Sequence, residues 1–174
     1  MRIVAGRWRG RRIDVPAGDD IRPTADRVRE AWMSIVSTSL PGARILDLFA
    51  GSGALGLEAL SRGALHADFV ETHAQSLVAL RANADSLGAS PNTTIHRSDA
   101  VRFADALAGR PYDLAFADPP YGKGFAGLVA TRWLRDPFAG ILSIEHGRNE
   151  VLPAGGETRR YGTTSITFYR VQDD

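Results

Sequence analysis

Along most of the chain, short apolar segments alternate with amphipathic ones, a pattern that predicts strands and helices in turn. Five apolar segments are expected to be strands: residues 44–49, 67–71, 93–96, 113–117 and 141–145. Each gap between successive strands has room for one helix. The first, second and fourth segments are almost continuously apolar, which is typical of strands buried on both faces. The sequence therefore predicts an α/β fold in which helices cover both faces of a parallel sheet.

Two further elements are predicted towards the ends of the chain. Val28 and Trp32 lie on one face of an amphipathic helix, and Thr24 before them is a suitable helix N-cap. Residues 158–161 and 165–171 flank a short turn and predict an antiparallel hairpin. The last part of the chain should therefore differ in topology from the βα units before it.

Composition indicates an ordinary globular protein. A length of 174 residues suits one domain, and a hydrophobic fraction of 44% suits a packed core. Because the chain lacks cysteine, a membrane-length apolar run and a secretory leader, we expect a cytoplasmic protein with no disulfide and no membrane span. The histidines lack metal-ligand spacing, so no metal is expected either.

The positive charge is concentrated at the start of the chain, although the formal net charge is only +1. The first twelve residues contain no acid and five arginines: Arg2, Arg7, Arg9, Arg11 and Arg12. We predict a basic β-hairpin arm over residues 1–20, followed by one domain over residues 21–174. Such an arm favours an anionic partner such as nucleic acid. The alternative is a solvated charged hairpin that binds nothing.

A glycine-rich turn follows the first predicted strand and leads into a helix. Gly51 and Gly53 let the backbone turn sharply and approach a ligand, and Gly56 lets the helix pack closely on the strand. The spacing also matches a dinucleotide fingerprint. However, Asp47 at the end of the strand would face a pyrophosphate, whereas it suits a cationic cofactor such as S-adenosylmethionine. The chain also lacks room for a second, hydride-accepting domain, which argues against a dehydrogenase.

Carboxylates lie at the carboxyl ends of three successive strands, at one edge of the predicted sheet, where ligands of such sheets bind. Besides Asp47, these are Glu71, which suits the ribose hydroxyls, and Asp99, which suits an adenine amino group. Each alone is equally explained as a helix cap or a surface charge, but together they indicate a site. The predicted cofactor-binding residues are Asp47, Phe49, Gly51, Ser52, Gly53, Glu71, Asp99 and Ala100.

Asp118-Pro119-Pro120-Tyr121 follows the fourth predicted strand and suits the binding of a planar amine. Asp118 and the Pro119 carbonyl can each accept one N–H, and the paired prolines keep the corner rigid. Tyr121 can stack on a base. The aspartate also stabilises the positive charge that develops on the nitrogen. We therefore predict Asp118, Pro119 and Tyr121 as catalytic residues for methyl transfer to an exocyclic base nitrogen.

With these motifs, the chain resembles class I S-adenosylmethionine-dependent methyltransferases, and more narrowly the RsmD family of bacterial 16S rRNA guanine-N2 methyltransferases. The resemblance covers nearly the whole chain. It rests on residues 2–10, 22–31, 46–64, 118–121 and 161–164. The cofactor and Asp-Pro-Pro-Tyr motifs are shared with many amino-methyltransferases, and the two N-terminal segments narrow the choice.

The resemblance implies a Rossmann-like, seven-stranded, mostly parallel sheet with its last strand antiparallel and a small N-terminal β extension. It implies S-adenosylmethionine as cofactor and methylation of guanine N2 at position 966 of 16S rRNA, in a small ribosomal subunit or its assembly intermediate. It also implies that Thr24 closes over the methionine end of the cofactor. A monomer is expected.

In this interpretation the arm binds the substrate RNA through Arg7, Trp8, Arg9, Arg11 and Arg12. Trp8 either stacks on an unpaired base or caps the underside of the hairpin. Two rival functions remain: a DNA adenine-N6 methyltransferase, and a non-catalytic ribosome-assembly factor that binds RNA and keeps a cofactor pocket.

Overall fold

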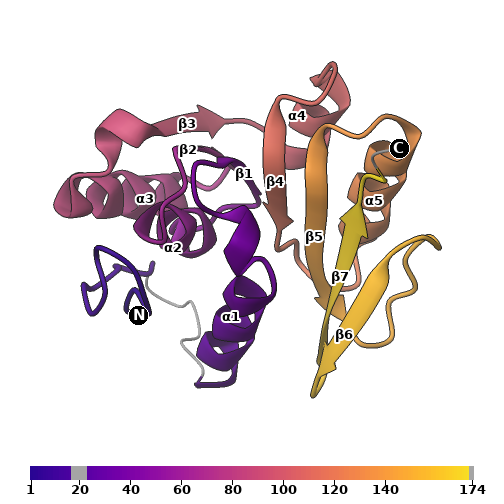
Figure 1. Ribbon diagram of the computed structural model, residues 1–174, viewed down its shortest axis with the longest axis horizontal. Helices are drawn as coiled ribbons and strands as arrows, with labels where there is room; N and C mark the ends of the chain where they lie inside the picture. Colours follow the sequence, from indigo (N-terminus) through magenta and orange to yellow (C-terminus); the bar gives the residue numbers. More distant parts are fainter. Residues whose placement is uncertain (17–22, 173–174) are drawn as a thin grey trace.

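A computed structural model describes residues 1–16 and 23–172, with Pro23 and Thr24 described by their backbone alone. A seven-stranded sheet crosses the molecule in the order β3-β2-β1-β4-β5-β7-β6 (Figure 1). The strands are β1 Arg44–Leu48, β2 His66–Glu71, β3 Thr93–Arg97, β4 Tyr112–Ala117, β5 Ala139–Gly147, β6 Glu157–Tyr161 and β7 Thr164–Arg170. The five predicted strands and the predicted hairpin are confirmed, and most of their ends shift by one or two residues.

Strand direction follows the sequence prediction. Strands β1 to β5 pair in parallel, and β7 pairs antiparallel with both β5 and β6. The hairpin therefore inserts β7 beside β5 and leaves β6 at the edge. Because β1 to β5 point the same way, their carboxyl ends meet at one edge of the sheet, where a ligand of such a fold binds.

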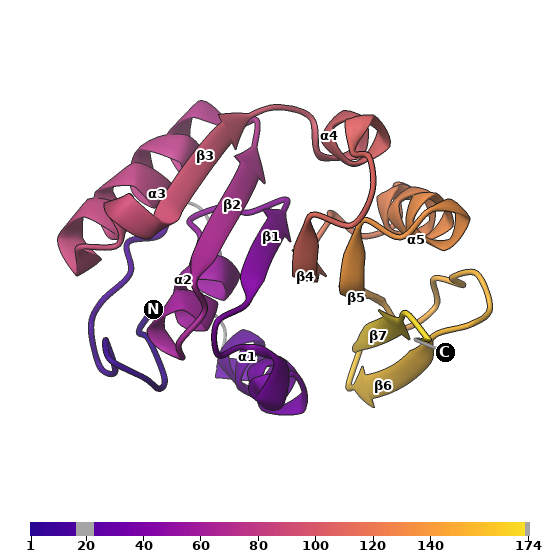
Figure 2. The same cartoon turned by 45° about the horizontal axis from the view of Figure 1, so that its top comes forward.

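Helices cover both faces of the sheet (Figure 2). Helices α1 Pro23–Ile35, α2 Ala54–Ser61 and α3 Ala74–Leu87 lie on one face, and α4 Ala100–Ala106 and α5 Phe125–Arg135 lie on the other. Two short 3₁₀ turns, Ser37–Ser39 and Ser90–Asn92, precede β1 and β3. A separate hydrophobic cluster fills the space on each side of the sheet, as the two-faced strand pattern predicts.

Helix α1 is fastened to the centre of the sheet by Trp32. The indole Nε1 donates to Ser143 Oγ at 2.8 Å, and its ring meets Phe116 edge to face at 5.6 Å. The prediction of Thr24 as the N-cap is wrong, because the helix already begins at Pro23. Proline is favoured in the first helical turn, where its missing N–H has no partner to lose.

The N-terminal segment, residues 1–16, packs against α2 and α3 and does not extend into solvent. Its strand pairing among the described residues is the single antiparallel bridge between Arg2 and Arg12. Val4 N and Ala5 N instead donate to the buried carboxylate of Glu58 at 2.8 and 3.2 Å. The two halves of the predicted hairpin are nevertheless joined by further backbone bonds, from Ile3 N to Arg11 O and from Ile13 N to Met1 O, each 2.9 Å. The predicted domain boundary at residue 20 lies outside the described residues.

Candidate functional site

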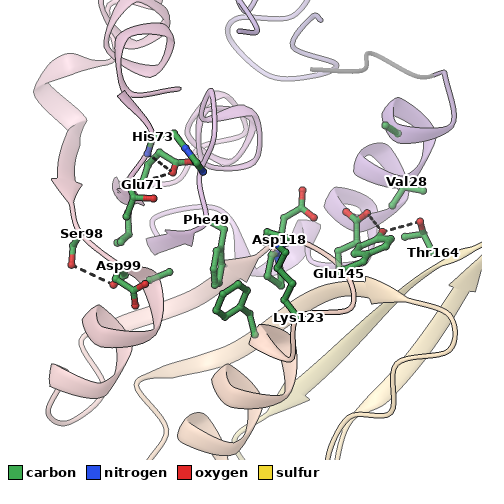
Figure 3. Close-up of a pocket in the computed structure, with 18 of the residues that line it drawn as sticks. Val28, Phe49, Glu71, His73, Ser98, Asp99, Asp118, Lys123, Glu145 and Thr164 are labelled. Atoms are coloured by element: carbon green, nitrogen blue, oxygen red, sulfur yellow. Dashed lines mark hydrogen bonds between the residues drawn. The ribbon is translucent and has the colours of Figure 1, made fainter. Parts of the chain in front are cut away.

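A cavity of about 940 Å³ opens at the carboxyl ends of β1 to β5. Its lining comes from every predicted strand end and from α1, α5 and the β6–β7 turn. Figure 3 shows Glu71, His73, Ser98 and Asp99 at one end, Glu145 and Thr164 at the other, and Phe49 and Asp118 between them. We call the first the cofactor end and the second the acceptor end.

The glycine turn supports the cofactor end from below. Gly53 has a left-handed φ of 89°, and a Cβ there would overlap Leu80, while a Cβ at Gly56 would overlap Phe69. The predicted close packing of helix on strand at Gly56 is thus confirmed. At Gly51 the left-handed φ of 57° favours glycine, but the space at its Cβ position is open.

Asp47 lies beneath this turn and does not line the cavity. It is buried, and its Oδ2 accepts from Gly56 N at 3.0 Å in the first turn of α2. Its Oδ1 has no hydrogen-bond partner among the described residues. Burial raises the pKa of Asp47 well above its ordinary value, and the charge of Glu71 raises it further. Asp47 therefore binds the start of α2 through one carboxylate oxygen, and its other oxygen accepts no hydrogen bond from the described residues.

Glu71 ends β2 and lines the cavity. Its Oε1 accepts from Gly51 N at 2.9 Å, and its Oε2 accepts from Thr72 N and His73 N at 2.6 and 3.2 Å. Three of the roughly four acceptor positions of a carboxylate are therefore used. The remaining one, on Oε1, can accept from a ligand hydroxyl. Glu71 thus also ties the glycine turn to the start of the next helix.

Asp99 is both a helix cap and a residue of the cavity wall, the two roles between which the sequence did not decide. Its Oδ1 accepts from Arg102 N at 2.9 Å and caps α4, and the same side chain lines the cavity. Ala100 next to it adds an apolar surface to the cavity wall. The second carboxylate oxygen of Asp99 can therefore meet a ligand while the first holds the helix.

Phe49 forms the middle of the cavity wall. It has a φ of 58°, a left-handed conformation that is costly for an aromatic residue and that typically persists where function requires it. Its ring packs against Phe125 with centroids 5.8 Å apart. Ser52, in contrast, is buried and does not line the cavity, and neither Gly51 nor Gly53 lines it.

The Asp118–Tyr121 corner follows β4 at the acceptor end. Asp118, Pro119 and Tyr121 all line the cavity, with Pro119 buried beneath the two more accessible side chains. The Tyr121 hydroxyl donates to Glu145 Oε1 at 2.5 Å and lies 3.0 Å from Thr164 Oγ1. These contacts link Tyr121 to β5 and β7. Burial is the main cause that raises the pKa of Tyr121 above its ordinary value.

Two carboxylates approach each other at this end. Desolvation by the protein around it raises the pKa of Asp118 well above its ordinary value although part of the residue is exposed, and the negative charge of Glu145 raises this pKa further. Such a pair is electrostatically unfavourable unless a proton or a donor lies between its members. The acceptor end is therefore prepared for a ligand with N–H groups.

Sequence reasoning missed several lining residues, above all Glu145, Lys123 and Thr164. Glu145 lies at the end of the fifth predicted strand, so the rule that selected Glu71 and Asp99 could have found it. Lys123 comes directly after the proline corner and is the chain's sole lysine. Thr164 gives no comparable signal, because the β6–β7 hairpin brings it to the cavity from far along the sequence.

The predicted RNA-binding arginines are exposed, but Trp8 is not. Arg7, Arg9, Arg11 and Arg12 are open to solvent, while Trp8 is only 9% exposed and lies under the Arg7 guanidinium at 4.2 Å. The structure favours the interpretation of Trp8 as a cap beneath the arm. Arg11 is anchored by a bond from Nη2 to Ser86 O at 2.7 Å.

Two classes of feature are not found in the described part of the chain. No helix there is long and apolar enough to cross a membrane. Nor do three or more histidine, aspartate or glutamate side chains gather there in an arrangement that could hold a metal ion.

The sheet order, the antiparallel seventh strand, the glycine turn after β1 and the proline corner after β4 define the class I methyltransferase fold. The solved structure of the Escherichia coli protein yhhF is similar, with a TM-score of 0.85, 33% identity and coverage of 100% of this chain and 99% of that one. The 16S rRNA N2 G1207 methyltransferase RsmC of Thermus thermophilus, in complex with AdoMet and guanosine, shares the fold. Its TM-score is 0.68 at 18% identity, covering 90% of this chain and 45% of that one.

Sequence comparison identifies the family. A family model described as conserved hypothetical protein 95 matches residues 1–170. Ribosomal RNA small subunit methyltransferase D of Escherichia coli K12 is 43% identical over 178 residues, which cover 98% of this chain and 88% of the relative. YlbH of Bacillus subtilis is 36% identical over 183 residues, covering 98% of each chain. The chain belongs to the RsmD family of ribosomal RNA methyltransferases.

Proposed function

We propose that the protein transfers a methyl group from S-adenosylmethionine to the exocyclic N2 of a guanine in 16S rRNA of the small ribosomal subunit. The resemblance implies position 966 as the target. One observation carries the proposal: a single cavity joins the acidic cofactor end, with Glu71 and Asp99, to the amine-accepting corner at Asp118. Donor and acceptor can therefore meet in one cavity.

The cofactor end fits S-adenosylmethionine chemically. Glu71 keeps one acceptor position for a ribose hydroxyl, Asp99 keeps one oxygen for the adenine amine, and Phe49 offers an apolar wall. The cofactor supplies an already activated methyl group. The proposed role of Thr24 at its methionine end concerns a side chain outside the described residues.

At the acceptor end the chain's own residues bind and orient the amine. Asp118 accepts a hydrogen bond from an N–H of the planar amine, and this bond reduces the conjugation of the nitrogen lone pair with the ring. The negative charge of Asp118 also stabilises the positive charge that develops on that nitrogen. The buried Pro119 keeps the corner rigid. Positioning of this kind contributes up to about 7–11 kcal/mol to catalysis.

The names of the relatives support ribosomal RNA as the substrate, because the Escherichia coli relative is a small-subunit rRNA methyltransferase. The target guanine must leave its stack to reach Asp118, as in other enzymes that modify a base. We place the reaction on the protein-bound subunit or its assembly intermediate in the cytoplasm, with the enzyme acting as a monomer.

Transfer of a tritiated methyl group tests this function. The protein is incubated with labelled cofactor and with unmethylated small subunits, naked 16S rRNA or DNA, and the labelled nucleoside is then mapped. We expect N2-methylguanosine at one position of the small-subunit RNA. Label in DNA as N6-methyladenine would support the rival DNA enzyme, and RNA binding without label would support the assembly factor.

The exposed arm arginines predict salt-sensitive binding of the substrate RNA. Replacing Arg7, Arg9 and Arg12 with glutamate should weaken binding and lower the slope of log K against log salt by roughly one unit per lost phosphate contact. Arg11 is left in place because it anchors the arm to α3. A filter-binding series over several salt concentrations measures the slope, and an unchanged slope would make the arm purely structural.

A further inference from the structure

Glu145 lines the acceptor end of the cavity, and the proposed methyl transfer gives it no role. It lies near the end of β5, is half-buried and lines the cavity close to Asp118. The Tyr121 hydroxyl, itself next to Thr164, donates to its Oε1 at 2.5 Å. The carboxylate is thus held from one side, and Figure 3 shows it beside Asp118 at the acceptor end.

An ionised carboxylate accepts hydrogen bonds and cannot donate them. Two adjacent carboxylates therefore favour a ligand edge that presents adjacent donors. The Watson–Crick edge of guanine does this, because its ring N1–H lies next to its exocyclic amine. Adenine and cytosine instead place a ring nitrogen lone pair next to the amine, and that lone pair would face a negative charge.

We propose that Glu145 selects guanine by accepting a hydrogen bond from the base N1–H while Asp118 accepts from the neighbouring amine. This inference rests on the proposed function and names the residue that determines its base specificity. Glu145 then discriminates chiefly through repulsion, because a base with a lone pair at N1 turns that lone pair towards the carboxylate and offers it no further donor.

The electrostatics of the site agree with this assignment. Desolvation and then the negative charge of Glu145 raise the pKa of Asp118, so repulsion between the two carboxylates disfavours the ionised form of Asp118. Donors on the guanine edge would relieve that repulsion for both groups at once. The amine of adenine would donate to Asp118, but the lone pair on adenine N1 would face the Glu145 carboxylate.

A purely structural role for Glu145, as the partner of the Tyr121 hydroxyl, makes a different prediction from base selection. The two are separated with small subunits reconstituted from unmethylated rRNA that carries guanine or 2-aminopurine at the target position. 2-Aminopurine keeps the reacting 2-amine but has a lone pair at N1. Methyl transfer is measured as kcat/KM on both substrates, and their ratio is compared between variants.

For the wild type we expect a preference for guanine over 2-aminopurine. Glu145→Gln should lower kcat/KM on guanine by about 10- to 100-fold and shift the ratio towards 2-aminopurine by about tenfold or more, because the amide can donate to N1. Loss of O6 in 2-aminopurine affects both enzymes alike and cancels in this comparison. Cofactor affinity by calorimetry should match the wild type.

Three matched variants complete the test. Tyr121→Phe removes the hydroxyl but keeps the Glu145 carboxylate, so it should slow transfer without changing the base preference. Glu145→Asp keeps the charge and should also keep the preference, even if Glu145→Gln proves unstable. Glu157→Gln makes the same chemical change on the exposed strand β6 and should alter neither rate nor preference.

The outcomes separate the two levels of inference. If the wild type methylates no substrate, the proposed function fails and the role of Glu145 fails with it. If the wild type methylates guanine but Glu145→Gln keeps its base preference, the role of Glu145 alone is overturned. A shift towards 2-aminopurine in Glu145→Asp or Tyr121→Phe would also contradict it, since both retain a carboxylate at this place.

Discussion

The two ends of the cavity use carboxylates in opposite ways. At the cofactor end, Glu71 and Asp99 accept hydrogen bonds from backbone N–H groups, so their charges are compensated before any ligand arrives. At the acceptor end, Asp118 and Glu145 approach each other, and the bond that orients Glu145 comes from the Tyr121 side chain. The cofactor end is thus preformed, while the acceptor end keeps an electrostatic cost that a substrate with N–H donors can relieve.

The largest expected effect is the loss of turnover in Asp118→Ala, which should leave cofactor binding intact. Asp118→Ala removes the amine acceptor and the stabilising charge, so kcat should fall by about 10²- to 10³-fold or more. Cofactor affinity should change little, because Asp118 lies beyond the cofactor end. Single-turnover methyl transfer and calorimetry measure the two quantities. Near-normal turnover, or a parallel loss of cofactor affinity, would remove the distinction between the ends.

A variant of Glu71, at the other end of the cavity, should instead weaken cofactor binding. Glu71→Gln replaces one carboxylate oxygen with an NH₂ group. The side chain loses its negative charge, and the new NH₂ group faces backbone N–H groups that also need an acceptor. We expect cofactor binding to weaken by about 10- to 100-fold, while affinity for the substrate RNA stays unchanged. Calorimetry with the cofactor and filter binding with RNA provide the comparison. Equal losses in both assays would indicate general unfolding of the site.

The sequence predicted the lining of the cavity only in part, for a physical reason. Glu71 and Asp99 belong to successive βα units, so strand periodicity and spacing place them at the same edge. Their backbone partners are also local, within a few residues or in the adjacent glycine turn. The bond from Gly56 N to Asp47 was not predicted, because a strand-end position does not reveal which neighbouring backbone group a carboxylate will meet.

The acceptor end is assembled from parts that are distant in the sequence. Asp118 and Tyr121 form a recognisable local motif, but Thr164 reaches them through an antiparallel insertion. The side-chain contact between Tyr121 and Glu145 spans strands β4 and β5, and no periodic pattern specifies it. Trp8 was similarly ambiguous, because its burial depends on how the N-terminal segment docks on α2 and α3.

Packing supports the cofactor end, and two helical glycines provide a matched test. A Cβ at Gly56 in α2 would overlap Phe69, whereas a Cβ at Gly127 in α5 would meet open space. Gly56→Ala should lower the free energy of unfolding by about 1–3 kcal/mol and weaken cofactor binding. Gly127→Ala should raise it by about 0.5–1 kcal/mol. Chemical denaturation measures both, and equal effects would show that the close approach is unimportant.

The smallest expected effect tests the electrostatic cost at the acceptor end. Since folding raises the pKa of Asp118, its proton stabilises the fold below the ordinary aspartate pKa, and this stability is lost as pH rises through the raised value. Asp118→Asn should therefore unfold at a higher temperature than the wild type at neutral pH. The gain should disappear towards pH ~4, where the wild-type residue is protonated in both states. A variant that is less stable at neutral pH would contradict the raised pKa.

The proposed function depends most on one cavity that holds the methyl donor beside the amine-accepting corner. Calorimetric titration of the folded wild-type protein with S-adenosylmethionine tests this directly. We predict one binding site per chain, weakened by Glu71→Gln and retained in Asp118→Ala. Absence of binding by the folded protein, or binding that is indifferent to Glu71, would contradict the account.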